Sequence, residues 1–508
     1  MVGRADLQLA RAGPAAIGEA VAMNDLARQT AELDAVGQAE LVASGQVTPL
    51  ELVDAAIARI EALDDGPEGI NAVIHRRFEQ ARREATDPNL PHGPFRGVPM
   101  AMKDLWPATA GDPLHLGNVA MRDARYSHPT DANITRAYRA AGMVIVGRTN
   151  TPELGAVATT EPLAYGPTRN PWNLAHSPGG SSGGAAAAVA AGMLPAANAS
   201  DGGGSIRIPA AACGLVGLKP SRGRISMGPL GDEWGVSVQH VVSVTVRDTA
   251  ALLDISAGYF VGDGVVAPTP SRPFAAEVGA HVEPLRIGLM SQPIAGPSDV
   301  EHSGAANEVG RWLESHGHHV ELASPGALEW WAGSDAGLTI WAVNMATNIA
   351  RMGDWIGRTL GEVDMEPATW GLLEMARDIS AVKLAQAQAM QSRLRRETAA
   401  WWSEFDLLLT PTTAIAPPVL GDIVARQDEP LRALIRSSPL ATFTGPWNAT
   451  GQPAISLPWS QSVQGLPIGV QLVGAYARED LLLRVAAAME SDRRWDTRRP
   501  PVHAGRVS

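Results

Sequence analysis

Hydrophobic and polar positions change repeatedly between two periods along the chain. Short apolar runs predict buried strands at 70–74, 97–105, 143–150, 214–221 and 405–413, and a hairpin of 453–459 and 467–474. Apolar residues at helical spacing predict helices at 34–64, 133–141, 373–402 and 479–490, and an alanine run predicts one at 185–191. Within 34–64, Thr48 and Pro49 are typical of a helix cap and first turn. Strands and helices that alternate to both ends of the chain predict an α/β layered core.

One domain accounts for this pattern. The proline-rich stretch 262–298 is the weakest part of the pattern and is open to interpretation as a surface excursion, but the α/β alternation continues on both sides of it, so the domain is not divided there. We expect a single domain over 24–495, preceded by an extension at 1–23 and followed by a tail at 496–508. The extension scatters charged residues among alanines without the apolar centre of a secretory signal, and Met23 is an alternative start.

Composition and charge narrow the classes of partner. The 508 residues are 45% hydrophobic and 19% charged, which is typical of a globular protein. The net charge of −12 leaves no basic footprint, so nucleic acid and anionic membranes are not expected as partners. No apolar run reaches the ~18 residues that span a bilayer. The single cysteine, Cys213, excludes an internal disulfide framework and fits a cytoplasmic location.

Two glycine clusters carry the candidate chemistry. The first is SPGGSSGGAAAAVAAG at 177–192. A flexible linker is not normally followed by a strong helix former and buried strands, and a phosphate cradle would need a lysine or a preceding strand that this stretch lacks. The second, SDGGGSIRIPAAACG at 200–214, places three glycines before Ser205. Consecutive glycines allow backbone N–H groups to face a developing oxyanion, so Ser205 is a candidate nucleophile.

A serine nucleophile needs a base, and two residues are candidates. His176 is close in sequence, but it lies in a proline-flanked loop, where a histidine that is hydrogen-bonded within the protein or faces solvent is the simpler interpretation. Lys103 follows an apolar strand, and burial there would lower its pKa towards neutrality. Taken alone, this position is explained better by a surface lysine beside Asp104 than by a buried base. Together with the other motifs, the buried base is the favoured interpretation.

Several motifs follow one another along the chain: the Lys103-Asp104 pair, GRTNTPELG (147–155), TRNPWN (168–173), GGSSGG (179–184), GGSIRIPA (203–210), CGLVGLKPS (213–221) and GQPAISLP (451–458). With these motifs in this order, the chain resembles the amidase signature family from about residue 30 to 490. The resemblance implies a mixed, twisted central β-sheet covered by helices on both faces. It also implies an amidase that needs no metal or cofactor, with a homodimer as its expected assembly.

The resemblance also assigns roles to residues. Ser205 is the nucleophile, Ser181 is a bridging serine joined to Gly180 by a cis peptide bond, and Lys103 is the base. The expected oxyanion hole is formed by backbone N–H groups of the glycine loop: Gly202, Gly203, Gly204 and Ser205. Three residues are expected to be structural support: Ser182, and Asp201 with Arg207 as an ion pair. Lys103 would take a proton from Ser181 as Ser181 takes one from Ser205, and water would hydrolyse the acyl-enzyme.

Substrate preference is predicted more coarsely. Many family members carry threonine or another side chain where this chain has Gly202, a difference expected to loosen the loop and widen the site. Within the family the chain resembles hydrolases of the cyclic 6-aminohexanoate dimer and bacterial urethanases, which implies small linear or cyclic amides and carbamates as substrates. The substrate-binding candidates are Trp106, Thr159, Gly180, Trp341, Trp447 and Asn448. Most other tryptophans nearby, among them Trp330, Trp331, Trp355 and Trp370, are expected to pack in the core.

Two alternative functions stay open at this point. The first is the amidase subunit of a glutamine-dependent tRNA amidotransferase; the tryptophan-rich segment 326–375 argues against it. The second is a non-catalytic or nucleotide-binding protein that keeps the fold; the presence of all three triad residues argues against it.

Overall fold

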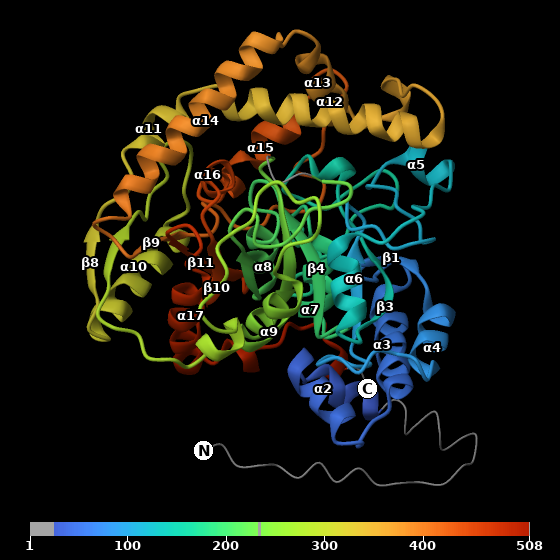
Figure 1. Ribbon diagram of the computed structural model, residues 1–508. Helices are drawn as coiled ribbons and strands as arrows, with labels where there is room; N and C mark the ends of the chain where they lie inside the picture. The colour runs from blue at the N-terminus through green and yellow to red at the C-terminus, as the bar shows by residue number, and fades with distance from the viewer. Residues whose placement is uncertain (1–24, 232–234, 507–508) are drawn as a thin grey trace, which may run out of the picture.

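The computed structural model describes residues 25–231 and 235–506, so the expected extension at 1–23 lies outside the described residues (Figure 1). A small sheet has the order β1-β3-β2, and a large mixed sheet has the order β4-β6-β5-β10-β11-β9-β7-β8. The strands are β1 Val73–Arg76, β2 Pro99–Lys103, β3 Val144–Thr149, β4 Ala196–Asp201, β5 Val216–Lys219, β6 Val238–Ser243, β7 Arg286–Leu289, β8 His319–Leu322, β9 Leu407–Pro411, β10 Ala454–Gln461 and β11 Pro467–Gly474.

Helices cover both faces of the large sheet and extend beyond it. They are α2 Ala35–Ala43, α3 Pro49–Asp64, α4 Phe78–Thr86, α5 Val119–Asp123, α6 Asn133–Ala140, α7 Gly183–Ala190, α8 Arg207–Cys213, α9 Val246–Ser256, α10 Val300–Ser315, α11 Ala327–Ala332, α12 Ala336–Ile356, α13 Pro367–Arg377, α14 Ala381–Trp401, α15 Arg432–Ala441, α16 Gly445–Thr450 and α17 Glu479–Arg493. Figure 1 shows α12, α13 and α14 as an arc above the end of the sheet where α15 and α16 lie.

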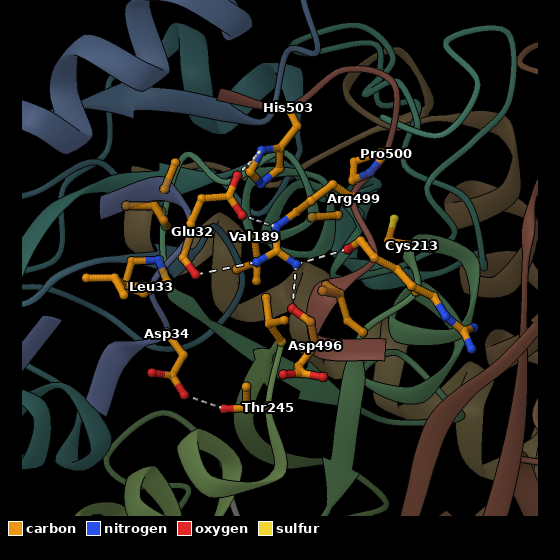
Figure 2. Close-up of a pocket in the computed structure, with 18 of the residues that line it drawn as sticks. Glu32, Leu33, Asp34, Val189, Cys213, Thr245, Asp496, Arg499, Pro500 and His503 are labelled. Carbon is orange, nitrogen blue, oxygen red and sulfur yellow. Dashed lines mark hydrogen bonds and ion pairs between the residues drawn. The ribbon is translucent and has the colours of Figure 1, made fainter. Parts of the chain in front are cut away.

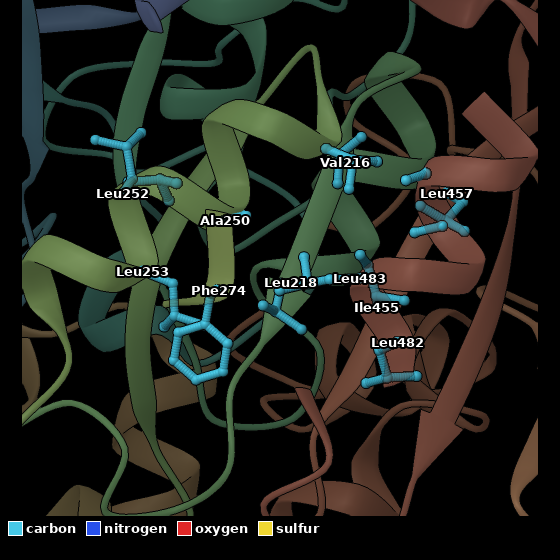
Figure 3. Packing of buried hydrophobic residues seen from close by; sticks show 14 of the residues in the cluster. Val216, Leu218, Ala250, Leu252, Leu253, Phe274, Ile455, Leu457, Leu482 and Leu483 are labelled. Atoms are coloured by element: carbon cyan, nitrogen blue, oxygen red, sulfur yellow. The ribbon is translucent and has the colours of Figure 1, made fainter. Parts of the chain in front are cut away.

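Alternation along the strands separates two cores. On β6, Val241 belongs to the cluster that includes α9, α10 and α17, whereas the next residue, Val242, belongs to the cluster of α7 and α8. Neighbouring side chains on a strand point to opposite faces, so the sheet lies between these two helical layers. Figure 3 shows the first layer, where Leu482 and Leu483 of α17 lie near Ile455 of β10. The expected mixed α/β architecture is therefore confirmed.

Local signals explain several element boundaries. Thr48 caps α3 in a reciprocal capping box with Glu51, and Pro49 occupies the first turn, as predicted. The predicted hairpin is present as antiparallel β10 and β11, with Gly465 at a φ of 77° in the turn.

Some expectations were wrong. The helix predicted over 373–402 is two helices, α13 and α14, because the Ser380 side chain accepts the Lys383 N–H and starts a new helix. The stretch 262–298 is more than a surface excursion, since it contributes β7, paired on both sides with β8 and β9. Within residues 25–231 and 235–506, no helix is long and apolar enough to cross a membrane.

Candidate active site

The end of one strand and two loops bring the predicted lysine and serines together. Lys103 is the last residue of β2, Ser181 lies just before α7, and Ser205 lies between β4 and α8. The Lys103 Nζ is 2.7 Å from Ser181 Oγ and 3.0 Å from Ser200 Oγ, and the lysine side chain is completely buried. Lys103 is therefore hydrogen-bonded, inside the protein, to two serines that are distant from it in the sequence.

The environment of Lys103 favours its neutral form. Burial lowers the pKa of this lysine to about 7, although the negative charge of Asp201 partly opposes the shift. A neutral amine at 2.7 Å from Ser181 Oγ can accept the serine proton. The alternative of a surface lysine in a turn is thus wrong.

Asp201 and Arg207 hold the glycine loop. Both side chains are fully buried, and the Arg207 Nε donates to Asp201 Oδ2 at 2.9 Å. Burial would raise the pKa of Asp201, but the charge and hydrogen bonds of Arg207 outweigh it and hold that pKa at about 2. Asp201 also accepts the N–H of Gly204 at 2.7 Å, and Asn448 Nδ2 donates to Asp201 Oδ1 at 2.9 Å. The loop is therefore fixed by a charged network.

The geometry changes the expected oxyanion hole. The Gly204 N–H already donates to Asp201, so it is not free to bind an oxyanion. Among the described residues, the N–H groups of Gly202, Gly203 and Ser205 have no hydrogen-bond partner in the protein. Three donors of the predicted four can therefore face a ligand. Gly204 is needed for shape instead, because its φ is 138° and a Cβ there would lie 2.3 Å from Thr444 Oγ1.

The Gly180–Ser181 peptide bond is cis, as the resemblance implied. A Cβ on Gly180 would lie 2.5 Å from the backbone oxygen of Thr159, so glycine permits this close packing. Ser182 anchors the same loop: its Oγ donates to the Ser200 oxygen at 3.1 Å and accepts the Ser200 N–H at 3.2 Å. Gly180, Thr159 and Ser182 therefore support the loop that carries Ser181.

Two cavities meet at Ser205. The outer cavity has a volume of about 540 Å³ and is mainly apolar, with Ile208, Leu328, Trp331, Ile340 and Leu434 among its lining residues. The inner cavity, of about 120 Å³, is more polar and is lined by Ser181, Ser200, Ser237, Asn344, Asn348 and Arg351, among others. Ser205, Gly202 and Trp341 line both. Among the described residues the Ser205 hydroxyl has no hydrogen-bond partner. It is therefore available to a ligand at the junction.

The substrate-binding candidates divide into two groups. Trp341 lies at the junction, Trp106 lines the inner cavity and Asn448 lines the outer one. Trp447 is instead fully buried in a core cluster, where its Nε1 donates to the Phe443 oxygen at 2.9 Å. Adjacent residues on α16 face different surroundings, so Asn448 reaches the cavity and Trp447 does not. Neither cavity is lined by Thr159 or Gly180.

Gly202 does not widen the site. A Cβ at this position would lie 3.3 Å from Cζ3 of Trp341 and 2.9 Å from Oγ of Ser237. The space that another residue's side chain would need is filled by the indole. The indole of Trp341 therefore occupies the space that the lack of a side chain at Gly202 leaves.

Sequence reasoning missed several residues around Lys103. Ser200 accepts from its Nζ, and Arg148, fully buried, donates to the Lys103 backbone oxygen at 2.7 Å. A signal for Ser200 was present in the alternation of Asn198 and Ser200 with alanines on β4. His176 takes no part: its Nδ1 is 2.8 Å from the Pro417 oxygen.

A separate cavity of about 290 Å³ lies between the N-terminal helices and the tail (Figure 2). Its charged groups are largely paired: Arg499 with Glu32 at 2.8 Å and Arg247 with Asp34 at 2.6 Å. Burial raises the pKa of the Cys213 thiol at its wall, so this cysteine is not a reactive thiolate. This cavity shares no residue with the glycine loop.

Comparison with known proteins agrees with the fold. The Amidase family matches residues 51–483, and the chain therefore belongs to the amidase signature family. The chain is an amide hydrolase of that family, and its relatives include 6-aminohexanoate-cyclic-dimer hydrolases. It is 43% identical to 6-aminohexanoate-cyclic-dimer hydrolase of Pseudomonas sp. (strain NK87), over 92% of this chain and 96% of the relative.

Solved structures of amidase signature enzymes have the same fold as this chain. A structure of 6-aminohexanoate cyclic dimer hydrolase matches with a TM-score of 0.88 and 42% identity, over 93% of this chain and 99% of the other. A glutamyl-tRNA(Gln) amidotransferase subunit from Thermotoga maritima matches with a TM-score of 0.71 and 28% identity, over 87% of this chain and 92% of the other. The weaker match does not favour the amidotransferase alternative.

Proposed function

We propose that the protein hydrolyses small amides through an acyl-enzyme formed on Ser205. The observation that carries this proposal is the buried contact of 2.7 Å between Lys103 Nζ and Ser181 Oγ, beside a serine loop with free N–H groups. Ser181 and Ser205 line the same inner cavity, and together with a neutral lysine they would form a proton relay that needs no histidine.

The steps follow from this arrangement. Ser205 Oγ attacks the amide carbonyl carbon while its proton passes to Ser181 and the Ser181 proton passes to Lys103. The N–H groups of Gly202, Gly203 and Ser205 stabilise the oxyanion; one such donor contributes ~3 kcal/mol. The C–N bond breaks as Ser181 gives a proton to the leaving nitrogen and takes one back from Lys103, which becomes neutral again. Water then attacks the ester carbonyl by the same relay, releasing the acid and free Ser205.

The cavities support a substrate class. The outer cavity is large and apolar, so it suits the acyl part of a small linear or cyclic amide. Carbamates have the same carbonyl and leaving nitrogen and are proposed as further substrates. Similarity to 6-aminohexanoate-cyclic-dimer hydrolases makes the cyclic dimer a direct candidate.

The test compares wild type with Ser205→Ala on an anilide, a matched carbamate, glutamine and the cyclic 6-aminohexanoate dimer, with products detected by mass spectrometry. We expect Ser205→Ala to lose at least about 1,000-fold in rate on the cleaved substrates. Ser403→Ala is the control, since Ser403 lines neither cavity and its hydroxyl donates to the Ala400 oxygen. Ammonia from glutamine alone would support the amidotransferase alternative, and equal rates for wild type and Ser205→Ala would refute the mechanism.

A further inference from the structure

One face of α12 presents polar side chains to the inner cavity. Trp341, Asn344, Asn348 and Arg351 follow one another at helical spacing and all line this cavity. The neighbouring face, with Ala342, Ile349 and Met352, packs in an apolar cluster. Polar groups on an otherwise apolar helix are thus directed at the space beside Ser181.

These polar groups have few partners in the protein. The Arg351 Nη1 donates to the Leu230 backbone oxygen, and its guanidinium carbon lies 5.8 Å from the ring centre of Trp106. Within the part of the chain that the structure describes, no carboxylate forms an ion pair with Arg351, and the side-chain amides of Asn344 and Asn348 make no hydrogen bond. A half-buried guanidinium with a free edge, flanked by amide donors, is suited to a carboxylate.

The relay indicates which part of the substrate enters the inner cavity. Ser181 lines the inner cavity and not the outer one, and it is the group proposed to protonate the leaving nitrogen. The nitrogen side of the scissile bond must therefore face the inner cavity. The acyl side then faces the apolar outer cavity, past Gly203.

We propose that the inner cavity binds the leaving amine through a carboxylate at its far end, with Arg351 as counter-ion and Asn344 and Asn348 as additional donors. The preferred substrates are then N-acyl ω-amino acids. This inference rests on the proposed function and names the leaving group of the same reaction.

Spacing along the helix selects an ω-amino acid over an α-amino acid. The Trp341 indole lies 3.3 Å from the Cβ position of Gly202, beside the nucleophile loop. Arg351 is ten residues further along α12, about 15 Å of helix, although its side chain leans back towards the helix N-terminus. A carboxylate next to the nitrogen would fall short of the guanidinium, whereas a chain of several methylene groups spans the gap.

The experiment uses three amides with one acyl group: N-phenylacetyl-6-aminohexanoate, N-phenylacetyl-hexylamine and N-phenylacetylglycine. We expect wild type to favour the 6-aminohexanoate amide over the hexylamine amide by about 10- to 100-fold in kcat/KM. Arg351→Met should bring this ratio close to one, mainly through KM, and Arg351→Lys should restore part of it. Arg393→Met is the control, because Arg393 also lies over a tryptophan, Trp330, but lines neither cavity.

The outcomes separate the two proposals. Ser205-dependent cleavage of the two longer amides at equal rates, with a ratio that Arg351→Met does not move, would overturn the ω-amino acid inference alone. A wild-type preference for the glycine amide would do the same. Binding of N-phenylacetyl-6-aminohexanoate to Ser205→Ala, measured by calorimetry, gives a readout without turnover: binding that Arg351→Met weakens supports the inference, and unaltered binding contradicts it. Turnover that Ser205→Ala retains in full would instead refute the proposed function.

Discussion

The protonation of Lys103 gives the most specific prediction for activity. Its pKa, lowered to about 7 by burial, means that the neutral form is present at mild pH. Below pH 7 the lysine becomes an ammonium group and can no longer accept a proton from Ser181. The expected change is therefore a loss of kcat/KM as pH falls, with no further rise at high pH.

The magnitude follows from this pKa of about 7. The neutral fraction is about 90% at pH 8 and about 1% at pH 5, a fall of about 90-fold in kcat/KM. A lysine with the ordinary pKa of 10.5 would behave differently. Its neutral fraction would still rise nearly tenfold per pH unit above pH 8.

The assay is kcat/KM for a neutral anilide from pH 5 to pH 10, with circular dichroism at each pH to confirm folding. Burial also raises the pKa of Glu153 to about 7, so a carboxyl group could produce a similar limb. Temperature separates them, because ammonium ionisation depends strongly on temperature and carboxyl ionisation hardly does. A rate that is constant down to pH 5, or that climbs tenfold per unit above pH 8, would refute the neutral-lysine relay.

Two further predictions concern the glycine loop. Asp201→Asn leaves Arg207 buried without a counter-charge and should lower the free energy of unfolding by about 3–5 kcal/mol in urea titrations, whereas Glu397→Gln, at an exposed ion pair, should leave it almost unchanged. Because the folded pKa of Asp201, about 2, is below its ordinary 3.8, its stabilising contribution should be present above pH 4 and be lost as pH falls through 2. Gly204→Ala places a Cβ 2.3 Å from Thr444 Oγ1 and should reduce kcat by about 100-fold, whereas Gly203→Ala, with no atom within 4 Å of its Cβ, should lose far less. Equal losses in these two variants would contradict the assigned loop shape.

The sequence predicted the parts of the fold that local patterns determine. Apolar runs predicted the main strands, and the pair Thr48 and Pro49 predicted the start of α3. The order of the motifs indicated the family. The strand β4 was missed because it is built largely from small residues that do not distinguish a strand from a helix. The break at Ser380 was missed because helical periodicity continues on both sides of one capping hydrogen bond.

Site residues that belong to sequence motifs could be predicted, whereas residues placed at the site by packing could not. Lys103, Ser181 and Ser205 belong to motifs, although only the fold brings Lys103 and Ser181 into contact. Trp341 and Trp447 have the same side chain, and only the orientation of each helix puts one at the cavity and the other in the core. The Gly204 N–H donates to the Asp201 side chain three residues earlier, and the contacts of Arg207 and Asn448 with that carboxylate could not be seen in the sequence.

Catalysis through an ester on Ser205 can be tested directly by trapping that ester. The enzyme is mixed with a slowly hydrolysed aryl ester or carbamate, quenched rapidly with acid, and analysed by intact-mass and peptide mass spectrometry. We expect a mass increase equal to the acyl group, located on the peptide that contains Ser205 and absent in Ser205→Ala. Product formation without an adduct under burst conditions, or an adduct located on Ser181, would contradict the proposed acyl-enzyme.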